Sequence, residues 1–504
     1  MTDRRDPMAQ EDFAQAYAAN VARLEGLYDP SQERDACGVG LVAALDGQQR
    51  RDVVMAGINA LKALWPRGAV DADGKTGDGA GIHVEIPQDF FADAIHTSGD
   101  DHIEGRIAIG MVFLPKTDLG AQEAGRAIIE TEILEFGYGI YGWRQVPIDT
   151  ACIGEKANAT RPEIEQIMIR NRLGRSEEDF ERDLYVIRRR IENAALAKHV
   201  DLYICSMSCR SVIYKGMFLA ENLTDFYPDL LDERFTSRFA IYHQRYSTNT
   251  FPTWKLAQPF RRIAHNGEIN TISGNVNWMR SHETRLADEA LNPFMGDLKP
   301  VVQPAGSDTA MLDNVFEMLT FAGRDAPMTK TMLVPASVGA NSAMTEKQRA
   351  LFSYCNAVME PWDGPAAICG TDGRWIVAGL DRAGLRPLRY MITENDLLVV
   401  GSETGMVRVP DAQIRELGRL GPGQTLGFDM KEARLYQPAE LLDLLAGRQD
   451  YEGWSQRIRN IGSVVRDDVA EPVFYAPEEL RRRQLAVNLT HEELETILHP
   501  MVET

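Results

Sequence analysis

The sequence predicts an α+β fold, in which strands and helices form blocks and do not alternate strictly as βαβ units. Short apolar runs rich in Val, Ile and Leu, bounded by Gly, Pro or Asp, predict buried strands. Longer segments with apolar residues at helical spacing predict helices, but these do not follow each strand in turn. The 504 residues allow roughly two to four ordinary domains, or one large domain with attachments.

The predicted strands run through most of the chain. They are expected at residues 37–46, 82–86, 107–114, 202–209, 211–214, 239–246, 366–369 and 375–380, with a hairpin at 392–402. A further short buried strand is expected at Met332-Leu333-Val334-Pro335.

Helices are predicted at 53–65, 118–136, 278–287 and 309–319, and a short amphipathic helix between Phe13 and Leu27. Residues 163–170 and 184–193 are rich in charge, so we expect them to form exposed faces. From about residue 433 the sequence becomes rich in Arg and Glu and helix-like in pattern.

The composition disfavours several classes of function. The net charge of −20 is a poor basis for binding nucleic acid or an anionic membrane. No run of eighteen apolar residues exists, and the N-terminus lacks the apolar core of a secretory signal. Six scattered cysteines do not resemble a secreted disulfide framework, so we expect a cytoplasmic protein.

Cys37 lies between Ala36 and Gly38, at the entrance to an apolar run. One interpretation is a small hydrophobic residue at the start of a core strand, which is the commoner fate of a lone cysteine. The other is a nucleophile. This stretch taken alone favours the first interpretation.

Two polar clusters follow predicted strands. Arg245 stands in a run of hydroxyl residues, where its planar fork suits a carboxylate or, alternatively, backbone carbonyls. The turn Asn266-Gly267 offers a side-chain amide beside a backbone N–H, the donors of an oxyanion hole, although Asn-Gly is more often a plain turn.

Two further clusters remain open between a structural and a functional role. Asp308, beside Ser307, either helps to cap the helix at 309–319 or receives a ligand ammonium group. Residues 381–387 form a structural turn or line a pocket. The glycine-rich loop 71–81 contains Gly-Lys-Thr, but its spacing and context do not fit a nucleotide-binding P-loop. No His or Cys spacing favours a metal site, and we expect none.

Together these segments resemble the class II glutamine amidotransferases, which use an N-terminal nucleophile, and most closely the amidotransferase domain of glutamate synthases. The matching motifs occur in the family's order: ACGVG at 36–40, RGA at 67–69, TGDGAGI at 76–82, GMVFLP at 110–115, GWRQVP at 142–147, YKGM at 214–217, RYSTNT at 245–250, HNGEINT at 265–271, GNVNWM at 274–279, GSDTAMLDN at 306–314, MEPWDGPAAI at 359–368 and GLRPLRY at 384–390.

The resemblance implies a role for each candidate residue. Cys37 would attack the amide of L-glutamine, and Asn266 with the Gly267 N–H would form the oxyanion hole. Arg245 would hold the substrate α-carboxylate and Asp308 its α-ammonium group. Arg67 would lie near the nucleophile and order the pocket.

An N-terminal nucleophile also makes chemical sense. A cysteine with a pKa of about 8.5 is mostly thiol at neutral pH, and no Cys–His pair is evident in the sequence. An α-amino group titrates at about 7.7–8.0 and can act as the base on the same residue. Residues 1–36 would then be a propeptide, 37–432 the amidotransferase domain, and 433–504 a linker with the start of a central domain.

The resemblance further implies the four-layer αββα sandwich of the N-terminal nucleophile hydrolases. It implies no cofactor on this chain. In complete glutamate synthases, ammonia passes to 2-oxoglutarate at an FMN domain beside a 3Fe–4S cluster. The implied partners are therefore the remaining synthase domains or a synthase chain, and an electron-donor subunit or ferredoxin; the sequence does not distinguish NADPH from ferredoxin.

Two alternatives stay open at this point. The chain could be a stand-alone N-terminal nucleophile hydrolase acting on another amide, although the pairing of Arg245 with Asp308 favours an amino-acid substrate. It could also be an inactive or regulatory fragment in which residues 1–36 remain attached.

Overall fold

A computed structural model describes residues 37–64, 67–71, 73–103, 105–245, 251–304, 306–339, 344–459, 462 and 474–503. The predicted propeptide, with its helix between Phe13 and Leu27, lies outside the described residues. The structure divides into two compact units at Glu452/Gly453.

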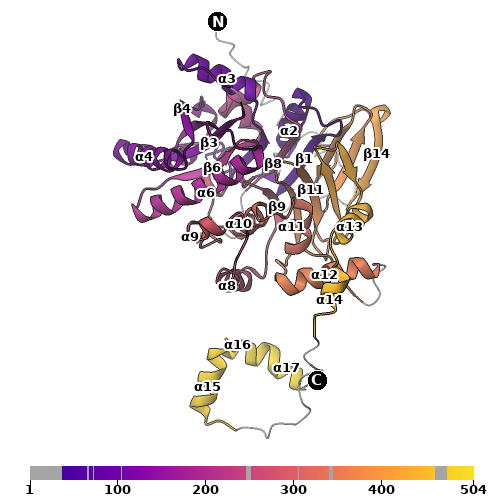
Figure 1. The fold of residues 1–504 in the computed structure, drawn as a ribbon. Helices are drawn as coiled ribbons and strands as arrows, with labels where there is room; N and C mark the ends of the chain where they lie inside the picture. The colour runs from indigo at the N-terminus through magenta and orange to yellow at the C-terminus, as the bar shows by residue number, and fades with distance from the viewer. Residues whose placement is uncertain are drawn as a thin grey trace. The chain divides into compact units, whose positions relative to one another are not determined.

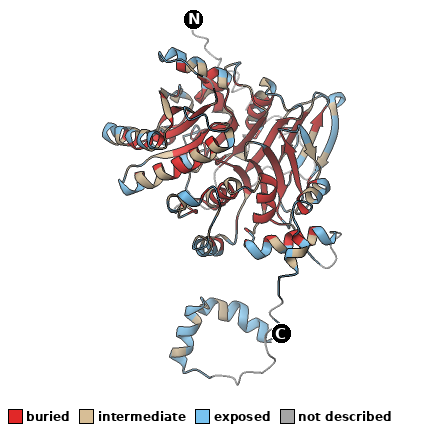
Figure 2. Cartoon of the chain, viewed as in Figure 1, coloured by how far each residue is buried: buried red, intermediate tan, exposed pale blue. Residues whose placement is uncertain are grey.

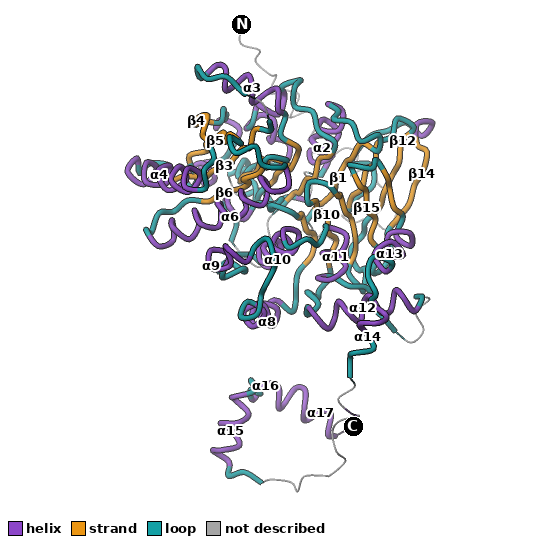
Figure 3. Tube along the Cα trace, in the orientation of Figure 1, coloured by secondary structure: helices purple, strands orange, loops and turns teal. Residues whose placement is uncertain are grey.

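The first unit contains three sheets (Figures 1 and 3). The seven-stranded sheet has the order β14 (Ile414–Arg419), β12 (Arg389–Thr393), β13 (Leu397–Gly401), β1 (Gly38–Ala44), β8 (Phe239–Gln244), β2 (Ala80–Glu85) and β7 (Ser211–Gly216). The five-stranded sheet has the order β16 (Arg434–Tyr436), β15 (Thr425–Asp429), β11 (Trp375–Leu380), β10 (Ala366–Thr371) and β9 (Ile263–Gly267). The four-stranded sheet has the order β4 (Gly139–Gln145), β5 (Glu163–Arg170), β3 (Ile107–Leu114) and β6 (Tyr203–Ser208).

Helices and shorter turns connect and cover these sheets. The helices of the first unit are α2 (Arg51–Ala63), α3 (Gln88–Thr97), α4 (Leu119–Glu135), α5 (Glu155–Ala159), α6 (Glu177–Ala197), α7 (Leu223–Phe226), α8 (Ile272–His282), α9 (Met295–Leu298), α10 (Asp308–Phe321), α11 (Ala326–Leu333), α12 (Glu346–Val358) and α13 (Pro438–Ala446). Helix α14 (Tyr451–Ser455) crosses the division between the units.

The seven- and five-stranded sheets pack face to face through one apolar cluster, which includes Val39 and Leu41 of β1 and Cys369 of β10. Helix α2 packs on the outer face of the larger sheet, and helices α10 to α13 pack on the outer face of the smaller one. Figure 2 shows most strands buried, apart from the edge strand β14, while the covering helices present their outer sides to solvent. The order helix, sheet, sheet, helix is the predicted αββα sandwich.

The four-stranded sheet extends this sandwich. One of its faces belongs to the same core as α2 and the outer face of the seven-stranded sheet. Its other face is covered by α4 and α6. The predicted strands at 37–46, 82–86, 107–114, 202–209, 211–214, 366–369 and 375–380 are confirmed, as is the hairpin of β12 and β13. The strand predicted at 239–246 is confirmed as β8, which ends at Gln244, and residue 246 lies outside the described residues.

The expectation that residues 163–170 are exposed is wrong. They form β5, which lies between β3 and β4 and is buried at six of its eight positions. The buried carboxylate of Glu165 is matched by Arg126 of α4, whose Nη2 lies 2.5 Å from Oε1. Charge in this strand is therefore paired and not solvated.

Residues 184–193 are also not an exposed face. They lie in α6, where Arg188 and Arg189 are buried together with the apolar side. Glu192 accepts from both guanidinium groups, at 2.6 Å and 2.7 Å. Buried Glu317 of α10 is a further partner of Arg188.

The predicted strand at 332–335 is wrong, because Met332 and Leu333 end helix α11. A short apolar run cannot distinguish a strand from a buried helix end. The local signals for a helix are present upstream, where Asp325 accepts from the Met328 N–H and Pro327 lies in the first turn. The predicted helix at 278–287 exists as α8 but begins earlier and ends at His282.

The two units differ in packing. Strand β16 pairs with β15 and α13 packs on the five-stranded sheet, so the first unit continues past residue 432, where the sequence placed the domain boundary, to Glu452. The second unit contains α15 (Pro477–Ala486), α16 (His491–Glu493), a π-helical turn (Leu494–Leu498) and α17 (His499–Glu503). None of its described residues is buried. Across the described residues, no helix is long and apolar enough to cross a membrane.

Candidate active site

Cys37 directly precedes β1, the strand that lies between β13 and β8 in the large sheet. Only 8% of the residue is exposed. The strand is fixed beside it, because the Val39 N–H donates to Ser402 Oγ at 3.1 Å and the Ser402 N–H donates to the Val39 carbonyl at 2.9 Å. Gly38 packs closely against Leu64, since a Cβ atom there would lie 2.8 Å from Leu64 Cδ1 and would require that side chain to shift. Cys37 is therefore held at the end of a rigid, buried strand.

Asn266 and Gly267 end β9 in the facing sheet. The Asn266 side-chain Nδ2 donates to the Cys37 carbonyl oxygen at 2.6 Å, so the two sheets meet at these residues. Gly267 has φ +147°, and a Cβ atom on it would lie 1.7 Å from the Pro365 carbonyl oxygen. Only glycine fits at this position, and the Asn-Gly pair lies at the cysteine.

Asp308 is the first residue of α10, with Ser307 as the N-cap. Its Oδ2 accepts from the Ile269 N–H at 2.9 Å, and its Oδ1 accepts from the Thr309 N–H at 2.7 Å. These contacts hold a buried carboxylate against the turn that follows Gly267. Ser307 caps the helix through the Ala310 N–H, so Asp308 is not the capping residue.

Arg245 follows β8 and has φ +92°, which is unusual for a residue with a side chain. Its N–H donates to the Gly79 carbonyl at 2.7 Å, and its Nε lies 3.0 Å from Asp78 Oδ2. Both side chains are buried. The sequence did not identify Asp78 as a site residue, although the acidic position inside the glycine-rich TGDGAGI motif was a usable signal.

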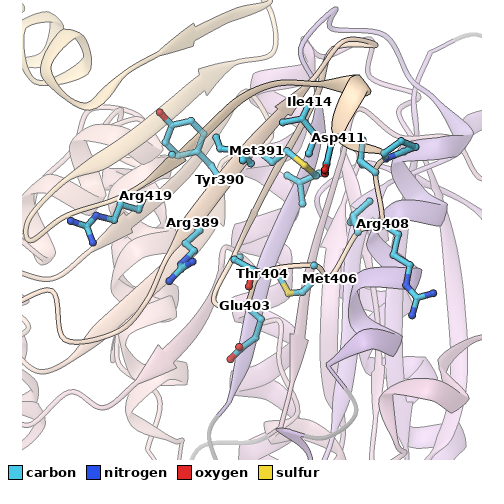
Figure 4. A pocket seen from close by; sticks show the side chains of 18 residues that line it. Arg389, Tyr390, Met391, Glu403, Thr404, Met406, Arg408, Asp411, Ile414 and Arg419 are labelled. Atoms are coloured by element: carbon cyan, nitrogen blue, oxygen red, sulfur yellow. The ribbon is translucent and has the colours of Figure 1, made fainter. Parts of the chain in front are cut away.

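Arg67 lies in the segment after α2 and pairs with Glu403, with Nη2 3.0 Å from Oε1. Glu403 directly follows Ser402, which is hydrogen-bonded to Val39 of β1. The ion pair is therefore connected to β1 close to Cys37. Glu403 also lines a cavity of about 940 Å³ on the outer side of β12, β13 and β14 (Figure 4). Figure 4 shows the Glu403 carboxylate directed away from Tyr390 and Met391, which also line that cavity.

Burial dominates the electrostatics of the Cys37 thiol and raises its pKa to about 11. Arg245 and Arg386 lower this pKa, whereas Asp78 and Asp308 raise it. These four charged groups therefore act on the ionisation of the thiol, although they come from four separate segments of the chain. Arg386 belongs to the turn at 381–387, whose role the sequence left open, and its charge lowers the pKa of the thiol.

Two buried histidines lie close to these residues. Burial lowers the pKa of His265 to about 4 and that of His243 to about 3, so both are neutral at pH 7. His265 Nδ1 lies 2.9 Å from Thr309 Oγ1, and His243 Nε2 lies 3.0 Å from the His265 carbonyl oxygen. One ring nitrogen of each histidine thus helps to hold β8, β9 and α10 together.

No group of three His, Cys, Asp or Glu side chains that could hold a metal ion occurs in the part of the chain that the structure describes. The arrangement offers a buried thiol whose pKa responds to two cations and two carboxylates. The Asn266 amide donates to the Cys37 carbonyl, and the Gly267 N–H belongs to the adjacent residue. Such a set suits attack on an amide carbonyl whose substrate carries both an acid and an amine.

Comparisons with known proteins give consistent results. The model of the family "Glutamine amidotransferases class-II" matches residues 37–454. The chain is 58% identical over 498 residues to the glutamate synthase [NADPH] large chain of Azospirillum brasilense, covering 98% of this chain and 33% of that protein. It is 38% identical over 475 residues to ferredoxin-dependent glutamate synthase 2 of Synechocystis, covering 93% of this chain and 30% of that protein.

The chain thus spans about a third of the length of these relatives. A solved structure, the glutamine phosphoribosylpyrophosphate amidotransferase from B. subtilis complexed with ADP and GMP, matches with a TM-score of 0.27 at 15% identity. That match covers 66% of this chain and 49% of the other.

Proposed function

The chain belongs to the class II glutamine amidotransferases, and we propose from this that it hydrolyses L-glutamine with Cys37 as the nucleophile. The observation that carries the proposal is the hydrogen bond between Asn266 Nδ2 and the carbonyl oxygen of Cys37, which supports a common site for the two residues. The sulfur attacks the side-chain amide carbon. Ammonia leaves, a γ-glutamyl thioester remains on Cys37, and water then releases glutamate.

The base in this mechanism is the α-amino group of Cys37 itself. The group exists only when the Ala36–Cys37 bond has been cut, so residues 1–36 act as a propeptide. The raised pKa of the buried thiol supports the need for such a base, because about one thiol in ten thousand is ionised at pH 7 when the pKa is about 11. An amine that titrates at about 7.7–8.0 can take the thiol proton and later give it to the leaving ammonia.

The tetrahedral intermediate is stabilised by Asn266 and Gly267. Two donors that point at the developing oxyanion act more strongly in the transition state than on the substrate. The steric environment of Gly267 supports this role, because the backbone is fixed where no side chain fits. Donors held in this way need no reorganisation during the reaction.

Substrate recognition uses the charges around the thiol. Arg245 binds the α-carboxylate of glutamine, and Asp308 binds the α-ammonium group. Asp78 Oδ2 lies 3.0 Å from Nε of Arg245 and supports the orientation of this guanidinium, whose planar fork suits a carboxylate. Arg67 orders the pocket near the nucleophile through its pair with Glu403.

We further propose that the chain supplies ammonia for glutamate synthesis in the cytoplasm, as its similarity to glutamate synthase large chains suggests. The ammonia is passed to 2-oxoglutarate at a synthase site outside this chain. That site uses FMN and a 3Fe–4S cluster, with electrons from an NADPH-linked subunit or from ferredoxin. None of the steps assigned to the residues above depends on these groups.

The proposal is tested by incubating the purified chain with L-glutamine and measuring the release of glutamate and ammonia. We expect Cys37→Ser to lower turnover by at least about 100-fold, since the hydroxyl is a much weaker nucleophile. Cys152→Ser is the matched control, because Cys152 is a free and only partly buried cysteine. Undiminished turnover in Cys37→Ser would rule out the mechanism.

A further inference from the structure

Asp381 lies directly after β11 and is almost fully buried, with 2% exposed. Its carboxylate has hydrogen-bond donors on both oxygens. Oδ1 accepts from the Ala366 N–H at 2.8 Å, and Oδ2 accepts from the N–H groups of Ala383 and Gly384 at 2.8 Å and 3.2 Å. The Asp381 N–H also donates to the Ala366 carbonyl at 3.0 Å. One side chain thus joins the start of β10 to the turn after β11.

The contact between Asp381 Oδ1 and the Ala366 N–H fixes the backbone next to Gly267. Ala366 lies directly opposite Gly267 in the antiparallel pair of β10 and β9. The preceding carbonyl, that of Pro365, accepts from the Glu268 N–H at 3.0 Å and occupies the place where a Gly267 Cβ would lie. Any displacement of Pro365 and Ala366 therefore displaces the backbone of Gly267.

The contacts between Asp381 Oδ2 and the N–H groups of Ala383 and Gly384 fix the turn that contains Arg386. Ala383 and Gly384 begin the tight turn of which Arg386 is the next charged residue, and Gly384 has φ +62°. The Gly423 N–H fixes the same corner by donating to the Asp381 carbonyl at 2.7 Å. Asp381 thus holds both the backbone opposite Gly267 and the turn that contains Arg386.

We infer that Asp381 is a positioning residue that aims the Gly267 N–H, and with it the proposed oxyanion hole, at the carbonyl attacked by Cys37. The inference rests on the proposed glutaminase function. It does not require Asp381 to touch the substrate. Its effect on the reaction arises because a donor displaced by a fraction of an ångström loses much of its interaction with the oxyanion.

Asp429 provides a matched control in the same sheet. It is also 2% exposed, ends β15, and accepts from the backbone N–H groups of Lys431 and Glu432 at 3.0 Å and 3.3 Å. It pairs with Arg374 and does not contact β9 or β10 through any contact that the structure records among the described residues. Asp429→Ala therefore removes a comparable carboxylate without disturbing Gly267.

The experiment measures kcat and KM for L-glutamine in the wild-type chain, Asp381→Ala and Asp429→Ala. It also measures inhibition by two ligands. The first is the γ-aldehyde analogue of glutamine. The Cys37 sulfur adds to its carbonyl carbon and forms a tetrahedral centre, whose oxygen then occupies the proposed oxyanion hole. Glutamate, in contrast, binds without forming a tetrahedral centre.

We expect Asp381→Ala to lower kcat by about 10- to 100-fold with little change in KM, and to weaken the aldehyde by a similar factor while leaving glutamate inhibition unchanged. Asp429→Ala should change none of these values, even where it lowers the melting temperature. Equal weakening of aldehyde and glutamate in Asp381→Ala, or an unchanged kcat, would overturn the inference.

Asp381→Asn is the milder variant in case the alanine variant does not fold. It keeps a carbonyl oxygen but places an NH₂ group among the N–H donors that the carboxylate accepted. We expect the ratio of aldehyde affinity to glutamate affinity in this variant to lie between the ratios of the wild-type chain and Asp381→Ala. A ratio equal to that of the wild-type chain would overturn the inference. A wild-type chain that does not turn over glutamine would contradict the proposed function instead.

Discussion

Burial sets the ionisation of the Cys37 thiol, and charge modifies it. A raised thiol pKa lowers the thiolate fraction at every pH below that value, so an uncut chain carries an unreactive cysteine at neutral pH. Arg245 and Arg386 oppose this effect but do not overcome it. Cleavage of the Ala36–Cys37 bond would add an α-amino group to Cys37, and this amine could take the proton of the thiol.

We expect alkylation of Cys37 by iodoacetamide in a chain that retains residues 1–36 to be at least about 100-fold slower at pH 7 than that of an ordinary cysteine. The rate should rise about tenfold per pH unit towards a pKa of about 11. In a chain that begins at Cys37, it should reach half its maximum near about pH 8. Peptide-resolved mass spectrometry measures both profiles, and equal profiles would contradict the assigned base.

The residue types of the site were predictable, but their neighbours were not. Cys37, Asn266, Gly267, Asp308 and Arg245 each carry a recognisable chemical group at a motif. The partners Asp78 and Glu403 become visible only through strand pairing and loop contacts between distant segments. Such contacts arise from the tertiary fold, which spacing in one sequence does not encode.

At the scale of elements, one carboxylate fixes the start of the strand that carries Asn266 and Gly267. Asp313 of α10 accepts from the backbone N–H groups of Arg261, Arg262 and Ile263, at 2.8 to 3.1 Å. These donors are buried. The helix that begins with Asp308 therefore also anchors β9, so one element holds both ends of this part of the site.

We expect Asp313→Ala to lower the free energy of unfolding by about 2–4 kcal/mol, because it leaves buried N–H donors without an acceptor. Urea denaturation at about pH 8 measures this with the wild-type carboxylate ionised, since burial raises its pKa to about 6. Asp118→Ala, which removes a single exposed N-cap bond of α4, should cost about 1 kcal/mol. Equal losses would contradict the anchoring role.

Regular apolar strands were predicted correctly, whereas elements with buried charge or short apolar runs were not. Strand β5 and helix α6 carry charges that look solvated in sequence, but Arg126, Glu192 and Glu317 neutralise them in the fold. The run at Met332 has no periodicity long enough to separate a helix from a strand. In each case a partner distant in sequence decides the outcome.

For the whole molecule, the first unit contains all three sheets and every residue placed in the candidate site. Its four apolar clusters use no residue beyond Tyr451. None of the described residues of the second unit is itself buried. Stability and glutamine hydrolysis should therefore both belong to the first unit.

We expect a chain that ends at residue 459 to keep the melting temperature of the full chain and its glutaminase kcat/KM within about twofold, since none of the described residues beyond 459 is buried. Calorimetry and glutamate release measure the two values side by side. A fall of more than about tenfold in kcat/KM would show that residues 460–504 contribute to the site.

The claim on which the mechanism depends most is that Cys37 is both the nucleophile and the first residue of the active chain. Intact mass measurement of protein that turns over glutamine tests it most directly. A mass corresponding to a chain that begins at Cys37 is the predicted result. Full glutaminase activity in protein whose mass still includes residues 1–36 would contradict the account.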